Sequence, residues 1–180
     1  MVEAAVHKTK ADVVRAYFEA TANGRAEDLR PIVADDAVFH YPGQHFISGD
    51  YKGKDAVVDL YATLWGIGQE GGFTPFLHEV IEGKDFVVVV LSYRLGMLPN
   101  KDLPGRACGL FRVEDGKIKE YWLFEWDQHM INDAFRVVGL KVARKRKGLL
   151  STVALLPRSA ASMIRLGRRL YGGYTAPTNV

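Results

Sequence analysis

Hydrophobic residues follow two different spacings along the chain, and the spacing changes near residue 70. Before that point, apolar residues recur every three or four positions, which predicts amphipathic helices over residues 10–23 and 53–68. A shorter helical stretch is expected at 26–33, and a strand at 37–41 that ends at a Pro-Gly pair. The first part of the chain is therefore expected to be mainly helical.

After residue 70 the pattern is typical of strands. The segments 73–81, 86–95, 106–113 and 118–127 are rich in β-branched and aromatic residues. A Glu-Asp-Gly-Lys run joins the last two, which predicts an antiparallel hairpin. Helices followed by consecutive strands indicate the α+β class. We expect a cone-shaped, curved antiparallel sheet, with the N-terminal helices enclosing an apolar pocket.

Charge divides the chain in another way. Of its 24 Lys and Arg residues, nine lie in 139–180, which contains no Asp or Glu. Within 140–174, apolar residues at helical spacing are interleaved with arginines, which predicts a basic amphipathic helix. We therefore expect one domain at 8–138 and a basic amphipathic extension at 139–180.

The partner of the extension is open among three alternatives. We expect it first to pack on its own domain or on a second subunit. An anionic membrane surface ranks second, because basic amphipathic helices bind such surfaces. Nucleic acid ranks a distant third, since no interleaved aromatic residues or reading motif accompany the basic run.

Composition narrows the chemistry. The single cysteine, Cys108, excludes a disulfide framework within the chain and a cysteine-rich zinc site. The spacing of His40 and His45 fits no metal motif, and there is neither a Gly-rich phosphate loop nor a nucleophile elbow. Signal-peptide character and an apolar run of ~20 residues are also missing. We expect a cytoplasmic protein that uses no metal and no cofactor.

Three segments in a fixed order, 13–43, 47–61 and 111–122, resemble the nuclear transport factor 2-like superfamily. More narrowly they resemble its SnoaL-like branch, which contains polyketide cyclases and lies near ketosteroid isomerase. The resemblance covers roughly residues 10–138 and implies one α+β cone domain. It also implies a homodimer formed through the outer face of the sheet.

The same resemblance shows which family acids this chain lacks. Tyr17 matches the oxyanion-binding tyrosine of ketosteroid isomerase, but Tyr41 and Gly109 stand where that enzyme has its two aspartates. Leu123 stands at the catalytic aspartate of the polyketide cyclases, and Cys108 near the Asp of the limonene epoxide hydrolases. Three known arrangements of acids are therefore absent.

Strand alternation indicates a replacement. If position 123 faces the pocket, then so do positions 121, 125 and 127, because side chains two apart on a strand share a face. Glu125 is then the best acid/base candidate, and Asp127 lies nearer the mouth. In the alternative interpretation Asp127 begins a helix as its N-cap and Glu125 pairs with an arginine.

Two further groups complete the expected site. His40 is a candidate proton carrier, although alternation allows only one of His40 and Tyr41 to point inward unless the strand is bulged. His45 is interpreted as a loop residue. Substrate contacts are expected from Tyr41, Tyr121, Leu123, Gly109, Phe111 and Trp65.

Together these residues favour a cofactor-free isomerase, cyclase or hydrolase that acts on a hydrophobic polyketide-, terpenoid- or steroid-like molecule. Tyr17 and Tyr41 would polarise an oxygen, while Glu125, aided by His40, would move the proton. The alternative is a non-catalytic protein that binds a lipophilic ligand and carries a membrane-surface or subunit-packing tail.

Overall fold

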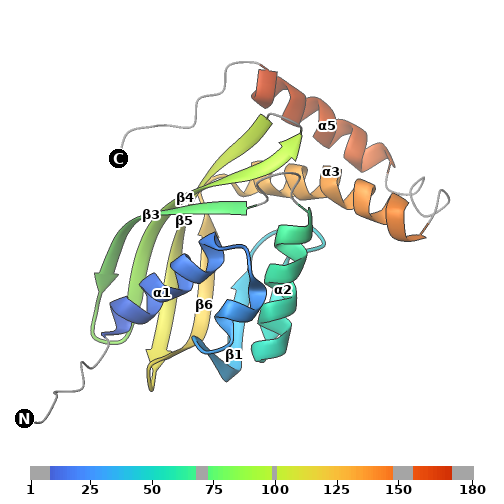
Figure 1. Cartoon of the computed structure of the whole chain (residues 1–180). Coiled ribbons are helices and arrows are strands. Elements are labelled where there is room, and N and C mark those ends of the chain that lie inside the picture. The colour runs from blue at the N-terminus through green and yellow to red at the C-terminus, as the bar shows by residue number, and fades with distance from the viewer. Residues whose placement is uncertain (1–8, 68–72, 99–100, 148–155, 172–180) are drawn as a thin grey trace, which may run out of the picture.

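The computed structural model describes residues 9–67, 73–98, 101–147 and 156–171 (Figure 1). Its helices are α1 (Lys10–Ala22), the 3₁₀ turn η1 (Ala26–Leu29), α2 (Lys54–Ile67), α3 (Gln128–Lys147) and α5 (Leu156–Tyr171). Its strands are β1 (Val33–Tyr41), β2 (Gly49–Lys52), β3 (Phe73–Glu82), β4 (Val87–Leu98), β5 (Lys101–Glu114) and β6 (Lys117–Glu125).

The strands form one six-stranded sheet in the order β2-β1-β6-β5-β4-β3. Neighbouring strands are antiparallel except β1 and β6, which pair in parallel. The α+β class is confirmed, but the sheet is mixed rather than wholly antiparallel. The segments from β2 to β5 connect β1 to β6 along the chain. A connection of this length allows the two strands to run in the same direction.

The start of α1 and the β5–β6 turn show how local sequence sets the ends of these elements. Thr9 caps α1, since its side chain accepts from the Asp12 backbone N–H while the Asp12 carboxylate accepts from the Thr9 N–H. The β5–β6 hairpin turns at Asp115 and Gly116, with φ of 49° and 71°, as a two-residue turn of this kind requires. The hairpin prediction is confirmed.

Strand β2 is an element that the apolar pattern did not predict. Gly49–Lys52 pairs antiparallel with β1, from Tyr41 opposite Gly49 to Val38 opposite Lys52. The strand is polar and short, so hydrophobic periodicity could not reveal it. Its backbone pairing with β1 and the positive φ of Gly49 and Gly53 at its two ends define it instead.

The helices α1 and α2 cover one face of the curved sheet (Figure 1), and the core lies between these helices and the sheet. The opposite face exposes apolar side chains from three strands, β3, β4 and β6, or their ends, with Trp126 the most exposed at 66%. The others are Phe76, Ile81, Phe86, Val88 and Phe124. The homodimer implied by the resemblance would use this face and stays a prediction.

The C-terminal part is built from α3 and α5, which lie against each other (Figure 1). The boundary expected between residues 138 and 139 falls inside α3, which is continuous from Gln128 to Lys147. Packing of α5 on α3 agrees with the first-ranked alternative for the extension, while 148–155 lie outside the described residues. Within the described chain, no helix combines the length and hydropathy needed to cross a bilayer.

Candidate active site

A pocket opens between the helices and the inner face of the sheet. Its space amounts to about 590 Å³ when the open mouth is counted, but the centre of a water molecule can move within only about 40 Å³ of it. Most of the lining is apolar and comes from α1, α2, α3 and the strands. The polar lining consists of Thr21, His45, Glu125 and five tyrosines: Tyr17, Tyr41, Tyr61, Tyr93 and Tyr121.

Glu125, at the end of β6, is the only Asp, Glu, Lys or Arg among the described lining residues. Its carboxylate accepts a hydrogen bond of 2.5 Å from the Tyr93 hydroxyl. Burial raises the pKa of Glu125 to about 7, and the hydrogen bond from Tyr93 opposes part of that rise. A carboxyl group with this pKa can both give and take a proton near neutral pH.

Tyr93 reaches Glu125 because a glycine faces it on the neighbouring strand. Tyr93 on β4 pairs with Gly105 on β5. A Cβ atom at Gly105 would lie 2.2 Å from the Tyr93 ring, so any other residue there would displace that ring. Gly105 is therefore part of the device that positions the acid.

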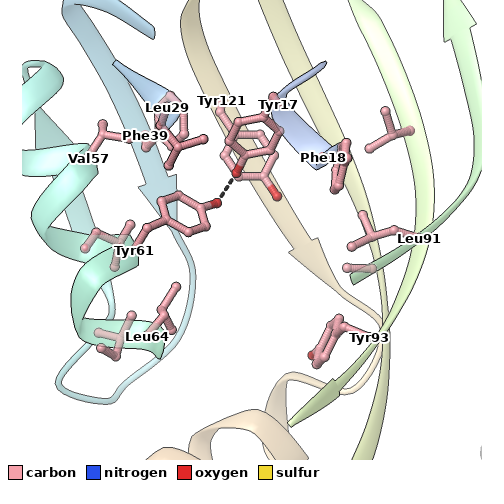
Figure 2. Packing of buried hydrophobic residues seen from close by; sticks show 14 of the residues in the cluster. Tyr17, Phe18, Leu29, Phe39, Val57, Tyr61, Leu64, Leu91, Tyr93 and Tyr121 are labelled. Carbon is pink, nitrogen blue, oxygen red and sulfur yellow. Dashed lines mark hydrogen bonds between the residues drawn. The ribbon is translucent and has the colours of Figure 1, made fainter. Parts of the chain in front are cut away.

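Three tyrosine hydroxyls form a chain on the other wall of the pocket. The Tyr61 hydroxyl bonds both the Tyr17 hydroxyl and, at 2.7 Å, the Tyr41 hydroxyl. Figure 2 shows Tyr17 from α1 and Tyr61 from α2 pointing toward each other above Tyr93. Three hydroxyls carry three protons, and two bonds use two of them. The third proton remains for an acceptor outside the chain.

Glu125 and the chain of three tyrosines line the same pocket and interact electrostatically. The charge of Glu125 contributes to raising the pKa of Tyr41 and of Tyr121, after the larger effect of burial. Tyr121, Leu123 and Glu125 all line the pocket, whereas Phe124 and Trp126 are exposed on the opposite face. Alternation along β6 thus brings a carboxyl within electrostatic reach of the tyrosine chain.

His40 does not reach the pocket, which corrects its expected role as proton carrier. Alternation along β1 turns Tyr41 inward and His40 outward, where His40 stacks on Trp122. Its ring bonds Asp50 at 2.8 Å and Glu120 at 3.1 Å. Partial burial lowers the pKa of His40, but the two carboxylates outweigh this effect and raise it.

Asp127 follows the alternative interpretation. Its carboxylate accepts from the Met130 backbone N–H at 2.9 Å, so it caps the N-terminus of α3. It is not among the pocket-lining residues. The hydrogen-bond partner of Glu125 is Tyr93, and not the arginine of the alternative interpretation.

Three expected substrate contacts, Gly109, Phe111 and Trp65, are not among the lining residues. Phe111 stacks on Tyr121 with ring centroids 4.3 Å apart, and a Cβ at Gly109 would lie 2.9 Å from each of these rings. Gly109 therefore makes room for the stack beneath the pocket. Trp65 packs against Tyr61, 5.6 Å between centroids, and lies behind the lining.

His45 is the lining residue whose role sequence reasoning missed. Its Nδ1 accepts from the Ile47 N–H at 3.3 Å, which leaves the ring proton on Nε2. Nε2 is buried and has no hydrogen-bond partner. Burial lowers the pKa of His45 to about 4, so the ring is neutral near pH 7. The only sequence signal was Pro42-Gly43, whose turn directs the following loop over the pocket.

The described residues also show how metal-ligating and cationic side chains lie relative to the pocket. These contain no group of three His, Cys, Asp or Glu side chains placed to hold a metal ion. Arg94, on β4, lies over the Phe76 ring, 5.3 Å from its centroid, and is exposed rather than turned into the pocket.

Comparisons with solved structures agree with this architecture. A protein of unknown function with a cystatin-like fold from Xanthomonas campestris aligns with a TM-score of 0.64 and 26% identity, covering 71% of this chain and 98% of that one. IdmH, a putative polyketide cyclase from Streptomyces antibioticus, aligns at 0.55 and 20%, covering 66% and 94%. A Mycobacterium tuberculosis LEH-like epoxide hydrolase aligns at 0.55 and 20%, covering 81% and 92%.

Sequence comparison gives the family. An uncharacterized protein of Mycobacterium tuberculosis is 29% identical over 107 residues, which are 59% of this chain and 81% of that protein. The family profile of the SnoaL-like domain matches residues 14–121, a span that holds the tyrosine chain and ends four residues before Glu125. The chain therefore belongs to the SnoaL-like domain family.

Proposed function

We propose that this protein is a cofactor-free acid/base enzyme that acts on a hydrophobic small molecule, with Glu125 as the group that moves the proton. The observation that carries the proposal is the Glu125 carboxyl, held by Tyr93 in an apolar pocket with a pKa of about 7. A carboxyl that served only to make the surface soluble would lie in water and not in a buried apolar pocket.

The chemistry follows from two facing groups. Glu125 as carboxylate takes a proton from a carbon next to a ligand carbonyl, and the electron pair moves onto the carbonyl oxygen. The outward proton of the Tyr17–Tyr61–Tyr41 chain hydrogen-bonds that oxygen as its charge develops. The protonated Glu125 then returns the proton at another carbon of the same conjugated system, which is isomerisation. Alternatively, the enolate carbon attacks a second carbonyl carbon of the same molecule and Glu125 gives its proton to the alkoxide that forms, which is cyclisation.

The lining sets the class of ligand. Apolar side chains surround the two polar groups, and the described lining holds no Lys or Arg that would attract an anion. Neutral polyketide-, terpenoid- or steroid-like molecules with a carbonyl group fit these conditions. IdmH, named as a putative polyketide cyclase, belongs to the same fold and supports the first of these. The neutral Nε2–H of His45 offers a second hydrogen bond to a ligand oxygen.

A non-catalytic ligand-binding protein is the competing function. It is favoured by the absence of carboxylates at Tyr41, Gly109 and Leu123, the positions used elsewhere in the superfamily. The narrow free interior is also compatible with a pocket that only opens around a tight ligand. Binding without turnover would then leave Glu125 as a polar anchor.

The deciding experiment uses two carboxylates of the same strand. A thermal-shift screen of carbonyl-bearing polyketides, terpenoids and steroids first supplies a ligand, because binding to the folded state raises the melting temperature. Deuterium exchange into that ligand is then followed by NMR for the wild type, Glu125→Gln and Glu120→Gln. Glu120 lies on the outer face, beside His40 and Arg112, and serves as control.

Acid/base catalysis predicts that Glu125→Gln slows exchange by about a hundredfold or more, while Glu120→Gln leaves the rate unchanged. If the ligand binds the wild type but no deuterium enters it and no product forms, the enzyme proposal fails and the binding protein remains. Equal rates for all three proteins would also contradict the proposal.

A further inference from the structure

Helix α5 is fixed to α3 by one buried acidic residue. Asp133 of α3 is 6% exposed, and its carboxylate accepts two hydrogen bonds of 2.6 Å from Arg165 and one of 2.8 Å from Ser162. Ser162 is fully buried, and Leu166, one turn further on, is 5% exposed. These contacts fix the rotation of α5 about its own axis.

That rotation turns other apolar side chains of α5 outward. Met163 is 45% exposed and Ile164 is 59% exposed, although both follow directly after the buried Ser162. Arg168, one turn beyond Ile164, is also exposed. A helix that served only to cover α3 would be expected to bury its large apolar residues and leave the serine outside.

Charge identifies the partner that would meet this surface. The stretch 139–180 has nine basic and no acidic residues, and Asp133 beneath α5 is already paired with Arg165. Apolar side chains flanked by arginines on an amphipathic helix match the boundary between headgroups and acyl chains of an anionic bilayer. The apolar sheet face of a second copy is the competing occupant, and the experiment below distinguishes it from the bilayer.

We infer that α5 docks this protein on an anionic lipid bilayer, with Met163 and Ile164 inserted at the headgroup boundary and arginines such as Arg168 at the lipid phosphates. The Asp133–Arg165 pair holds the helix in the docking orientation. This inference goes beyond the proposed acid/base function and does not depend on it, because none of the residues involved lines the pocket.

The position of α3 connects the docked surface to the pocket. Ile131 and Phe135 of α3 line the pocket, while Asp133, between them in sequence, faces α5. Helix α3 therefore lies between α5 and the ligand cavity. A lipophilic ligand dissolved in the bilayer would be concentrated next to the protein that binds it.

The test measures partition of the full-length protein onto vesicles. Vesicles of phosphatidylcholine alone are compared with vesicles that also contain phosphatidylglycerol, by co-sedimentation at low and high salt. The variants are Met163→Gln/Ile164→Gln and Arg168→Gln. Ile81→Gln is the matched control, since Ile81 is 54% exposed and lies on β3, outside the proposed docking surface.

We expect binding to the anionic vesicles only, weakened by salt and by Arg168→Gln. The double variant should bind at least about tenfold more weakly, because two partly buried apolar side chains are lost from the lipid boundary, and Ile81→Gln should bind like the wild type. Thermal melting checks that each variant is folded.

Two results overturn the inference. One is the absence of binding to anionic vesicles, or binding that the double variant does not change. The other is self-association of the wild type without lipid, measured by sedimentation velocity and abolished by the double variant, which would make a second copy the occupant. Neither result affects the deuterium-exchange test of Glu125.

Discussion

The Tyr93 hydroxyl donates a hydrogen bond of 2.5 Å to the carboxylate of Glu125, inside a pocket whose other walls are mostly apolar. Burial and this hydrogen bond act in opposite directions on the same group. Burial disfavours the charged carboxylate, and the hydroxyl stabilises it. Their balance sets the pKa of Glu125 near 7.

Replacing Tyr93 with Phe should therefore raise the pKa of Glu125 above its present value of about 7, because the stabilising donor is lost while burial remains. A rise of about one unit is expected from the loss of one hydrogen bond to a charged group. NMR titration of the Glu125 side chain measures it directly. A pKa that stays the same or falls would show that Tyr93 does not stabilise the carboxylate.

The raised pKa of Glu125 also predicts how stability depends on pH. The folded protein binds this proton more tightly than the unfolded chain, whose carboxyl has the ordinary value of 4.5. The contribution of Glu125 to stability is thus fully present below about pH 4.5 and is lost as pH rises through about 7. The cost above pH 7 is up to about 3 kcal/mol.

Glu125→Gln should remove that loss, so its advantage in unfolding free energy over the wild type should grow between these two pH values. Urea unfolding at several pH values measures the difference. Glu120→Gln serves as the control and should show no such growth. A wild-type protein that keeps the same difference from Glu125→Gln at every pH would contradict the raised pKa.

Tyr61 joins the hydroxyls of Tyr17 and Tyr41, and Tyr61→Phe removes the centre of the chain. The buried Tyr17 hydroxyl then loses its partner, so the free energy of unfolding should fall by about 1–3 kcal/mol. Ligand affinity or turnover should fall as well. Tyr51→Phe is the matched control, since Tyr51 donates to the Ile47 carbonyl at 2.6 Å outside the lining.

Tyr51→Phe should lose stability but keep ligand binding. If both tyrosine variants lower ligand affinity equally, the chain has no specific role at the ligand oxygen.

His45→Phe tests whether the unpartnered Nε2–H serves a ligand. The ring stacks on Phe135 with centroids 4.6 Å apart, and phenylalanine preserves that contact. The variant loses the bond from the Ile47 N–H but also removes a buried polar atom without a partner, so stability should change by less than about 1 kcal/mol.

Ligand affinity should fall about fivefold to tenfold if Nε2–H bonds a ligand oxygen. Isothermal titration with a ligand from the thermal-shift screen measures the change. Unchanged affinity, in a variant of normal stability, would assign His45 a packing role only.

Asp133→Asn should loosen α5 without weakening the sheet. The substitution removes the negative charge of the carboxylate that accepts from Arg165 and Ser162. Amide hydrogen exchange in α5 should therefore accelerate by about tenfold. Exchange in β5 and β6 should not change. Asp55→Asn, which breaks an exposed pair with Arg30, is the control and should leave α5 unaffected.

Acid should have the same local effect as that variant. Burial raises the pKa of Asp133, but the bonds from Arg165 and Ser162 lower it by more. Its stabilising effect is therefore fully present above the ordinary pKa and is lost as pH falls from that value through the lower pKa of the folded state. Exchange in α5 that is as slow in Asp133→Asn as in the wild type would show that other contacts hold the helix.

The sequence by itself determined the class of fold and most of its elements, but not strand β2. Apolar spacing predicted α1, α2 and the four long strands, because the apolar residues recur with the period of the element whose buried face they form. Period-two alternation also placed Glu125 on the face of Leu123, since neighbours two apart on a strand share a side. The same rule indicated that only one of His40 and Tyr41 could point inward, but it did not indicate which one.

Tertiary structure decided what those faces meet. The pairing of β1 with β6 turns Tyr41 toward Tyr61 and leaves His40 with Asp50 and Glu120, and no local pattern specifies that pairing. Tyr93 and Glu125 are 32 residues apart in sequence and become partners only because β4, β5 and β6 lie side by side. The rotation of α5 likewise depends on Asp133, 32 residues before Arg165. Periodicity records the face on which a residue lies, whereas hydrogen-bond partners distant in sequence are chosen by the packing of whole elements.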